Sequence, residues 1–152
     1  MPEGWRIVKE KHAATAFSGE GAARTGGRWN SRGVAVVYVS NRKSLAALET
    51  LVHLNPPVLF KYVVFHLEFE EKLVEAVELT KLPKDWQMAP PPPSTKQIGD
   101  AWVREGRSAV LSLPSVIIPE EVNYLLNPAH PDFKKIEIGR ATEFTFDPRL
   151  LA

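Results

Sequence analysis

The sequence predicts an α+β fold, with helices packed on a mixed, strand-rich central sheet. Segments rich in β-branched and aromatic residues outnumber segments with helical spacing. The length of 152 residues matches one domain, because most domains contain about 100–150 residues. The sequence contains no internal repeats. We therefore expect residues 1–152 to form one compact domain.

The first half of the chain contains four predicted strands, each an apolar run bounded by turn-forming or polar residues. They are expected over residues 5–8, 34–40, 58–69 and 73–79. The second of these is apolar toward both faces, which predicts a strand that is covered on both sides.

The clearest helix of the first half is expected over residues 45–54, where apolar side chains recur every three or four positions. Ser44 stands at the N-cap position, where its oxygen could accept a hydrogen bond from the first turn. Residues 55–57, an Asn-Pro-Pro sequence, should end the helix because proline lacks the N–H donor. A shorter helix is expected over residues 12–17.

Four consecutive prolines occupy positions 90–93. Residues 88–95 should therefore form a stiff loop, and neither a helix nor a central strand. This loop should not separate two domains, because neither side alone contains enough apolar strands for a second core. The remaining elements are a helix over residues 95–105 with Gly106 as its stop, strands over 109–118 (interrupted by Pro114), 136–138 and 144–146, and a loop over 121–133.

Composition excludes several classes of protein. The absence of cysteine excludes disulfides, thiolate metal sites and a cysteine nucleophile. No apolar run reaches the roughly 18–20 residues of a membrane span, and the first residues lack a signal-peptide core. These features predict a soluble, cytoplasmic protein without a membrane partner.

Charge is segregated along the chain, although 19 basic and 18 acidic residues leave a net charge of only +1. No acidic residue lies between Glu20 and Glu49, and residues 19–33 contain five of the nine glycines together with Arg28. Glycine lets the backbone approach a ligand closely, and arginine binds phosphates with a planar fork. The window therefore predicts either an anion-binding loop or a solvated basic loop.

Three further side chains are candidates for a site. Glu49 lies at the edge of the apolar face of its helix, where it could form a salt bridge to the basic window or face a cationic ligand. Tyr38 lies near the end of a predicted strand, as a half-buried aromatic residue or a ligand contact. Ser115 follows Pro114, as a satisfied core hydroxyl or a site residue.

Familiar sequence templates are missing. The sequence contains no dinucleotide fingerprint, Walker loop or GxSxG elbow. Its four histidines lack metal-ligand spacing, so no metal site is expected. Signatures of RNA-binding modules are also absent.

Several ordered blocks of the sequence resemble the RES domain family, over almost the whole chain. The blocks are residues 26–30 (GGRWN), 37–38 (VY), 47–49 (ALE) with His53, 113–115 (LPS) and 121–128 (EVNYLLNP). The family is named for an arginine, a glutamate and a serine. In this chain they correspond to Arg28, Glu49 and Ser115.

The resemblance implies a fold like that of ADP-ribosyltransferases and the toxin of a bacterial Xre–RES type II toxin–antitoxin system. Such toxins deplete NAD by releasing nicotinamide, and some transfer ADP-ribose to a protein. The implied partners are NAD as substrate, an Xre-type antitoxin that covers the active site, and a second toxin copy within the complex. DNA would be reached only through the antitoxin, and no metal or cofactor besides NAD is implied.

The implied chemistry assigns a role to each candidate. Glu49 would stabilise the positive charge that develops on the ribose. Arg28 would hold the pyrophosphate or orient the nicotinamide side, Tyr38 would stack on the nicotinamide ring, and Ser115 would position the substrate. Arg6 is a further candidate for binding NAD, with a purely structural role as an equal alternative.

Two other functions remain open from the residues. The chain could be an RNA-cleaving toxin with His53 or His66 as general base. It could also be a non-catalytic module that binds nucleotides or nucleic acid. Whether water, phosphate or a protein side chain attacks the ribose is not decided by the sequence.

Overall fold

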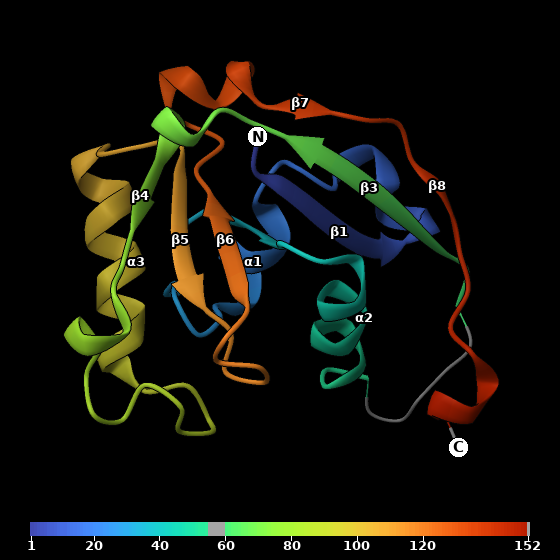
Figure 1. Cartoon of the computed structure of the whole chain (residues 1–152), viewed down its shortest axis with the longest axis horizontal. Coiled ribbons are helices and arrows are strands. Elements are labelled where there is room, and N and C mark those ends of the chain that lie inside the picture. Colours follow the sequence, from blue (N-terminus) through green and yellow to red (C-terminus); the bar gives the residue numbers. More distant parts are fainter. Residues whose placement is uncertain (55–59, 152) are drawn as a thin grey trace.

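A computed structural model describes residues 1–54 and 60–151 of the chain. The described residues form one sheet of eight strands in the order β4-β5-β6-β2-β1-β3-β7, with β8 paired to β3 beside β7 (Figure 1). The strands are β1 (Glu3–Lys9), β2 (Val37–Ser40), β3 (Tyr62–Glu68), β4 (Val74–Ala76), β5 (Val110–Pro114), β6 (Val122–Leu126), β7 (Glu137–Ile138) and β8 (Thr142–Phe144). The sheet is mixed, because β4 and β5 are parallel whereas the other pairs are antiparallel.

Three α-helices accompany the sheet in the described part of the chain. They are α1 (Glu20–Thr25), α2 (Lys43–Leu51) and α3 (Pro93–Glu105). Short 3₁₀ segments are η1 (Glu10–Thr15), η2 (Glu71–Leu73), η3 (Leu79–Lys81), η4 (Pro131–Lys135) and η5 (Pro148–Leu151). Figure 1 shows α3 alongside β4 and β5, and α2 between β6 and the C-terminal segment. None of the described helices has the length and apolar character needed to cross a membrane.

The sheet divides into two parts between β1 and β2. These strands pair at one position, Trp5 opposite Ser40. By contrast, β1 pairs with β3 along seven residues and β2 pairs with β6 along four. Figure 1 shows the consequence: β4, β5 and β6 run across the direction of β1 and β3, so the sheet is strongly curled. Helix α2, which packs against both β1 and β2, lies at this junction.

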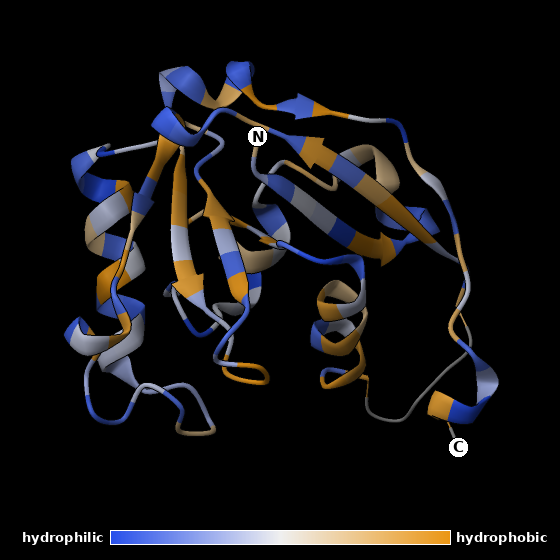
Figure 2. Ribbon diagram, viewed as in Figure 1, coloured by the Kyte–Doolittle hydropathy of each residue, from blue (hydrophilic) through white to orange (hydrophobic). Residues whose placement is uncertain are grey.

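The core consists of three groups of buried side chains. One group covers the junction of the sheet and includes Val39 and Leu67. A second packs α3 onto β5 and β6 around Trp102, which is fully buried. The third lies beneath α2 and includes Ala46 and Tyr62. Figure 2 shows hydrophobic residues concentrated on β3, β5 and β6, as expected for strands that are covered by other elements.

The predicted α+β class with a mixed sheet is confirmed, and most strands lie where the sequence placed them. The helix after the prolines ends at Gly106 as predicted, with this glycine in the left-handed conformation (φ 59°). The predicted end of the earlier helix at residues 55–57 lies outside the described residues, as do positions 58 and 59 of a predicted strand.

Three local predictions were wrong. Residues 121–133 were expected to form a loop, but they contain β6, a central strand. Ser44 is not the N-cap of α2, because the helix begins at Lys43 and Arg42 occupies the cap. Helix α3 begins at Pro93, inside the expected loop, since proline fits the first helical turn where no N–H donor is needed.

Candidate active site

Glu49 and Ser115 are joined by a hydrogen bond across the junction of the sheet. The Ser115 hydroxyl, on the loop after β5, donates to Oε1 of Glu49 on α2 over 3.0 Å. The same hydroxyl oxygen accepts hydrogen bonds from the backbone N–H groups of Ile117 (3.1 Å) and Ile118 (3.2 Å). With its acceptor sites engaged, the hydroxyl directs its hydrogen at the carboxylate. Ser115 is fully buried, whereas Glu49 is half-buried and keeps access to solvent.

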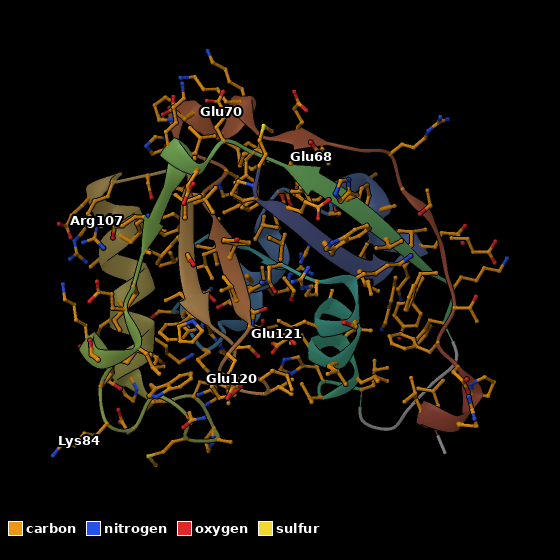
Figure 3. All side chains as sticks on the ribbon, in the orientation of Figure 1. Glu68, Glu70, Lys84, Arg107, Glu120 and Glu121 are labelled. Carbon is orange, nitrogen blue, oxygen red and sulfur yellow. The ribbon has the colours of Figure 1, made fainter. Side chains whose placement is uncertain are left out.

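The loop that carries Ser115 is anchored at its other end. The backbone N–H of Ser115 donates to the carbonyl of Glu121 over 3.0 Å. Figure 3 shows Glu120 and Glu121, which directly precede β6, at the lower end of β5 and β6. The loop between β5 and β6 therefore delivers the serine to the helix that carries Glu49.

The structure argues against one of the two interpretations of Glu49, the salt bridge. Within the described residues, Glu49 forms no ion pair. Its hydrogen-bond partner is the neutral hydroxyl of Ser115. The predicted salt bridge from helix to basic loop is therefore not formed, and the negative charge is held in place without being neutralised.

Arg28 lies in a tight turn after α1, within the glycine-rich window that was expected to form a loop but contains this helix. The turn is closed by the N–H of Gly27, which donates to the carbonyl of Asn30 over 2.9 Å. From it, Nη1 of Arg28 donates to the carbonyls of Trp86 (2.9 Å) and Met88 (2.7 Å). Burial lowers the pKa of Arg28, and the nearby negative charge of Glu49 acts in the opposite direction. The guanidinium therefore lies close enough to the Glu49 carboxylate for their charges to interact, although the two groups form no ion pair.

Tyr38 supports this turn through its hydroxyl. The oxygen accepts a hydrogen bond from the N–H of Trp29 (3.1 Å), and the hydroxyl donates to Oδ1 of Asn30 over 2.6 Å. Burial raises the pKa of Tyr38 above its ordinary value, so the group stays protonated and can donate. A Cβ atom at Gly27 would lie only 2.7 Å from the Tyr38 hydroxyl oxygen, so this approach requires glycine.

Arg6 of β1 forms a hydrogen bond to β2 next to the single residue pair that joins these two strands. Its Nε donates to the carbonyl of Ala16 over 2.7 Å, and its Nη1 donates to the carbonyl of Tyr38 over 2.9 Å. Burial lowers its pKa to about 10. Arg6 forms no ion pair with any described acidic residue. These contacts show the structural role that the sequence left open for Arg6.

Several residues of the site were missed by the sequence analysis. Asn30 is fully buried, and its amide nitrogen donates to the carbonyls of Ala22 and Val34. Lys96 and Asp100 of α3 also bind the loop that carries Arg28. The only signal in the sequence for the role of Asn30 was its place in the GGRWN block. The α3 residues are too distant in sequence for any local pattern to connect them with the loop.

The potential metal ligands lie elsewhere. Among the described residues, Glu3, His66 and Glu68 have ligand atoms within 4.8 Å of one another, on paired ends of β1 and β3. Nε2 of His66 lies 2.9 Å from Oε1 of Glu3. No hydrogen bond links this group to Arg28, Tyr38, Glu49 or Ser115 in the described part of the chain.

Comparison with known proteins identifies relatives over nearly the full length. The sequence model of the family described as "RES domain" matches residues 3–147. A protein of Sphingobium sp. (strain YBL2) named "Prs ADP-ribosylating toxin" is 40% identical, over 97% of this chain and 95% of the relative. A protein of Yersinia enterocolitica named "Toxin Res" is 37% identical, over 96% of this chain and 97% of the relative.

The fold also matches a solved structure. A chain of the crystal structure of the M. tuberculosis MbcT–MbcA toxin–antitoxin complex superposes with a TM-score of 0.76. The match covers 98% of this chain and 86% of the other, at 15% sequence identity. At this identity, the similarity concerns the fold.

Proposed function

The chain belongs to the RES domain family, and on that premise we propose that it is the toxin of a toxin–antitoxin pair that cleaves the nicotinamide–ribose bond of NAD. The names of its relatives support the toxin assignment. The observation that carries the proposed chemistry is the carboxylate of Glu49, which forms no ion pair, accepts a hydrogen bond from Ser115 and lies near enough to Arg28 for their charges to interact.

The carboxylate suits the charge that the reaction develops. When the bond between the ribose carbon and the nicotinamide nitrogen breaks, both electrons leave with nicotinamide, which becomes neutral. Positive charge then spreads over the ribose carbon and ring oxygen, as in glycoside cleavage. A carboxylate fixed beside the ribose stabilises this charge and needs no reorganisation at the moment of reaction. Ser115 fixes the orientation of Glu49 through the 3.0 Å hydrogen bond.

Arg28 and Tyr38 would bind the remainder of the dinucleotide. The Arg28 guanidinium is planar and permanently charged, which suits the pyrophosphate or the carboxamide side of nicotinamide. Because the Tyr38 hydroxyl is occupied by the turn, the aromatic ring is the part of Tyr38 that is left to stack on nicotinamide. Arg6 would act indirectly, by holding Tyr38 in place through its carbonyl.

The acceptor is water, phosphate or a protein side chain. Water, or a side chain whose attacking atom carries a hydrogen, loses that proton as the new bond to ribose forms, whereas phosphate attacks through an oxygen that is already ionised. The name of the Sphingobium relative, an ADP-ribosylating toxin, supports a protein acceptor for that relative. An antitoxin partner is supported by the structural neighbour, which was solved as a toxin–antitoxin complex. We propose that an Xre-type antitoxin covers the site of this chain, and that the toxin acts on cytoplasmic NAD.

The function can be tested by incubating the purified protein with NAD, with and without phosphate, and identifying the products by mass. We expect nicotinamide together with ADP-ribose, phosphorylated ADP-ribose or a modified protein. Glu49→Gln should lower the rate by ~10²-fold or more, the cost of removing a preorganised charge. The matched control is Glu120→Gln, an exposed carboxylate on the loop between β5 and β6, which should keep the wild-type rate.

Two results would contradict this proposal. Wild-type turnover in Glu49→Gln would show that the carboxylate does not stabilise the transition state. RNA degradation in cells at unchanged NAD levels would favour the RNA-cleaving alternative instead.

A further inference from the structure

We propose that helix α3 acts as a clamp on the turn that carries Arg28, and that Lys96 is the positioning residue for the Arg28 guanidinium. The inference rests on the proposed NAD-cleaving function, because it assigns Arg28 to the anionic part of the substrate. It adds a second element to the site, 69 residues away in sequence from the turn.

Three residues on one face of α3 contact the turn. Nζ of Lys96 donates to the carbonyl of Gly27 over 2.7 Å and to the carbonyl of Asn30 over 3.4 Å. These two carbonyls are the two ends of the turn, so one ammonium group joins both of them. One helical turn later, Asp100 accepts from the N–H of Ser31 (2.9 Å) and from its hydroxyl (2.5 Å).

Gly99 sets how closely α3 approaches the turn. An added Cβ at this position would collide with the carbonyl oxygen of Trp29. The helix therefore lies against the backbone of the turn itself, with no side chain between them. Direct backbone contact of this kind leaves the turn little freedom to shift.

The contacts fall on both sides of Arg28 in the sequence. Lys96, Gly99 and Asp100 together contact residues 27, 29, 30 and 31. The side chain of Arg28 bonds instead to the carbonyls of Trp86 and Met88. The contacts with α3 thus hold the backbone of Arg28 in place. The position from which the Arg28 side chain extends is therefore fixed as well.

The charge of Lys96 also fits the proposed ligand. Carbonyl oxygens carry partial negative charge, and the ammonium offsets it beside a turn that would bind a pyrophosphate. Without Lys96, the partial negative charge on the carbonyl oxygen of Gly27 would lie beside the proposed pyrophosphate site with no ammonium group to offset it. We therefore expect Lys96 to affect NAD binding through Arg28, and to affect the chemical step much less.

A double-mutant cycle tests this coupling. Lys96→Met removes the charge and keeps the apolar stem. It should raise the KM for NAD about tenfold, the scale of losing one hydrogen bond to a charged group, with kcat changed much less. In an Arg28→Ala background, Lys96→Met should cause no further rise. Lys96→Arg should restore most of the affinity, and the matched control Arg104→Met, on the exposed part of α3, should behave as wild type.

A readout that needs no NAD separates this inference from the proposed function. In Lys96→Met, amide hydrogen exchange should become faster at residues 27–31 and stay unchanged in β5. Unchanged exchange at residues 27–31, or an equal rise in KM in both backgrounds, would overturn the clamp. A wild-type protein that does not consume NAD would refute the proposed function alone.

Discussion

The hydrogen-bond partner of Glu49 is the neutral hydroxyl of Ser115. A neutral partner leaves the negative charge of the carboxylate available to a ligand. A salt bridge would give the carboxylate a local counter-charge that competes with a developing cation. The hydroxyl of Ser115 orients the carboxylate over 3.0 Å without cancelling its charge. Two backbone N–H groups hold the Ser115 oxygen in place. Since Ser115 in turn orients Glu49, the backbone of this loop fixes the orientation of the carboxylate.

Replacing Tyr38 by phenylalanine tests the role of its hydroxyl. The variant keeps the ring but loses the hydrogen bonds to Trp29 and Asn30. We expect a loss of stability of about 1–3 kcal/mol, because a buried N–H and a buried amide oxygen lose a partner. In a chain of this size each kcal/mol lowers Tm by about 2–4 °C. The KM for NAD should rise as the turn of Arg28 loosens.

Calorimetry and NAD-consumption kinetics would measure both effects. Tyr124→Phe is the matched control, since its hydroxyl makes no hydrogen bond with other described residues. If Tyr38→Phe matched wild type while Tyr38→Ala lost activity, the ring alone would matter, as the sequence led us to expect.

The sequence identified Arg28, Tyr38, Glu49 and Ser115 as candidates. The structure brings Glu49 and Ser115 into contact and places Arg28 near Glu49 and Tyr38. Their catalytic roles remain predictions. The supporting partners could not be predicted, because Lys96 meets Gly27 from 69 residues away. Such pairings depend on how α3 packs, and no local pattern in the sequence encodes them.

At the scale of elements, β6 shows why a central strand can escape detection. It contains only five residues, and prolines at positions 119 and 128 flank it closely. Turn-forming residues therefore dominated the local pattern. Its place is set by pairing with β2 and β5 on its two sides, which is tertiary information. Helix α2, by contrast, was predicted to within about two residues at its start, because its apolar spacing is local.

The junction of β1 and β2 provides a prediction at this scale. Arg6 of β1 bridges the parted strands by donating a hydrogen bond to the carbonyl of Tyr38 on β2, and it donates a second to the carbonyl of Ala16 after η1. Lysine has one donor group and cannot reproduce the guanidinium fork, so Arg6→Lys should lose about 1–3 kcal/mol of stability. Urea denaturation would measure this. Arg24→Lys, an exposed arginine of α1, is the matched control and should be neutral. Equal stability of the two variants would show that the Arg6 bridge does not hold the strands.

At the scale of the molecule, basic and acidic residues are nearly equal in number but are concentrated in different parts of the chain. Residues 21–48 lack acidic side chains and include the loop and turn of Arg28. Figure 3 shows Glu68 and Glu70 at the top of the molecule and Glu120 and Glu121 in its lower half. A net charge of +1 therefore conceals a basic stretch of sequence without acidic residues, and Arg28 of this stretch lies near the carboxylate of Glu49. That pattern suits a compact dinucleotide better than a long polyanion, which needs an extended basic surface.

The narrow junction raises the question of whether the two parts of the sheet unfold together. They are linked by one residue pair between β1 and β2, the hydrogen bond from Arg6 to the carbonyl of Tyr38, the contacts of α2 and one continuous buried group. Because that group contains side chains from β2 and β3, such as Val39 and Leu67, separating the parts would expose it. We therefore expect one cooperative transition, as a single domain over residues 1–152 requires.

The measurement compares two signals during urea denaturation. Far-UV circular dichroism reports on the whole sheet, whereas the fluorescence of a Trp5→Phe variant reports on Trp29, Trp86 and Trp102, which lie in or against the group packed beneath α3. Coincident midpoints and equal m-values in the variant would confirm one cooperative unit. A biphasic dichroism curve with a single fluorescence step would contradict it, because the strands around β1 and β3 would then unfold separately from those packed on α3.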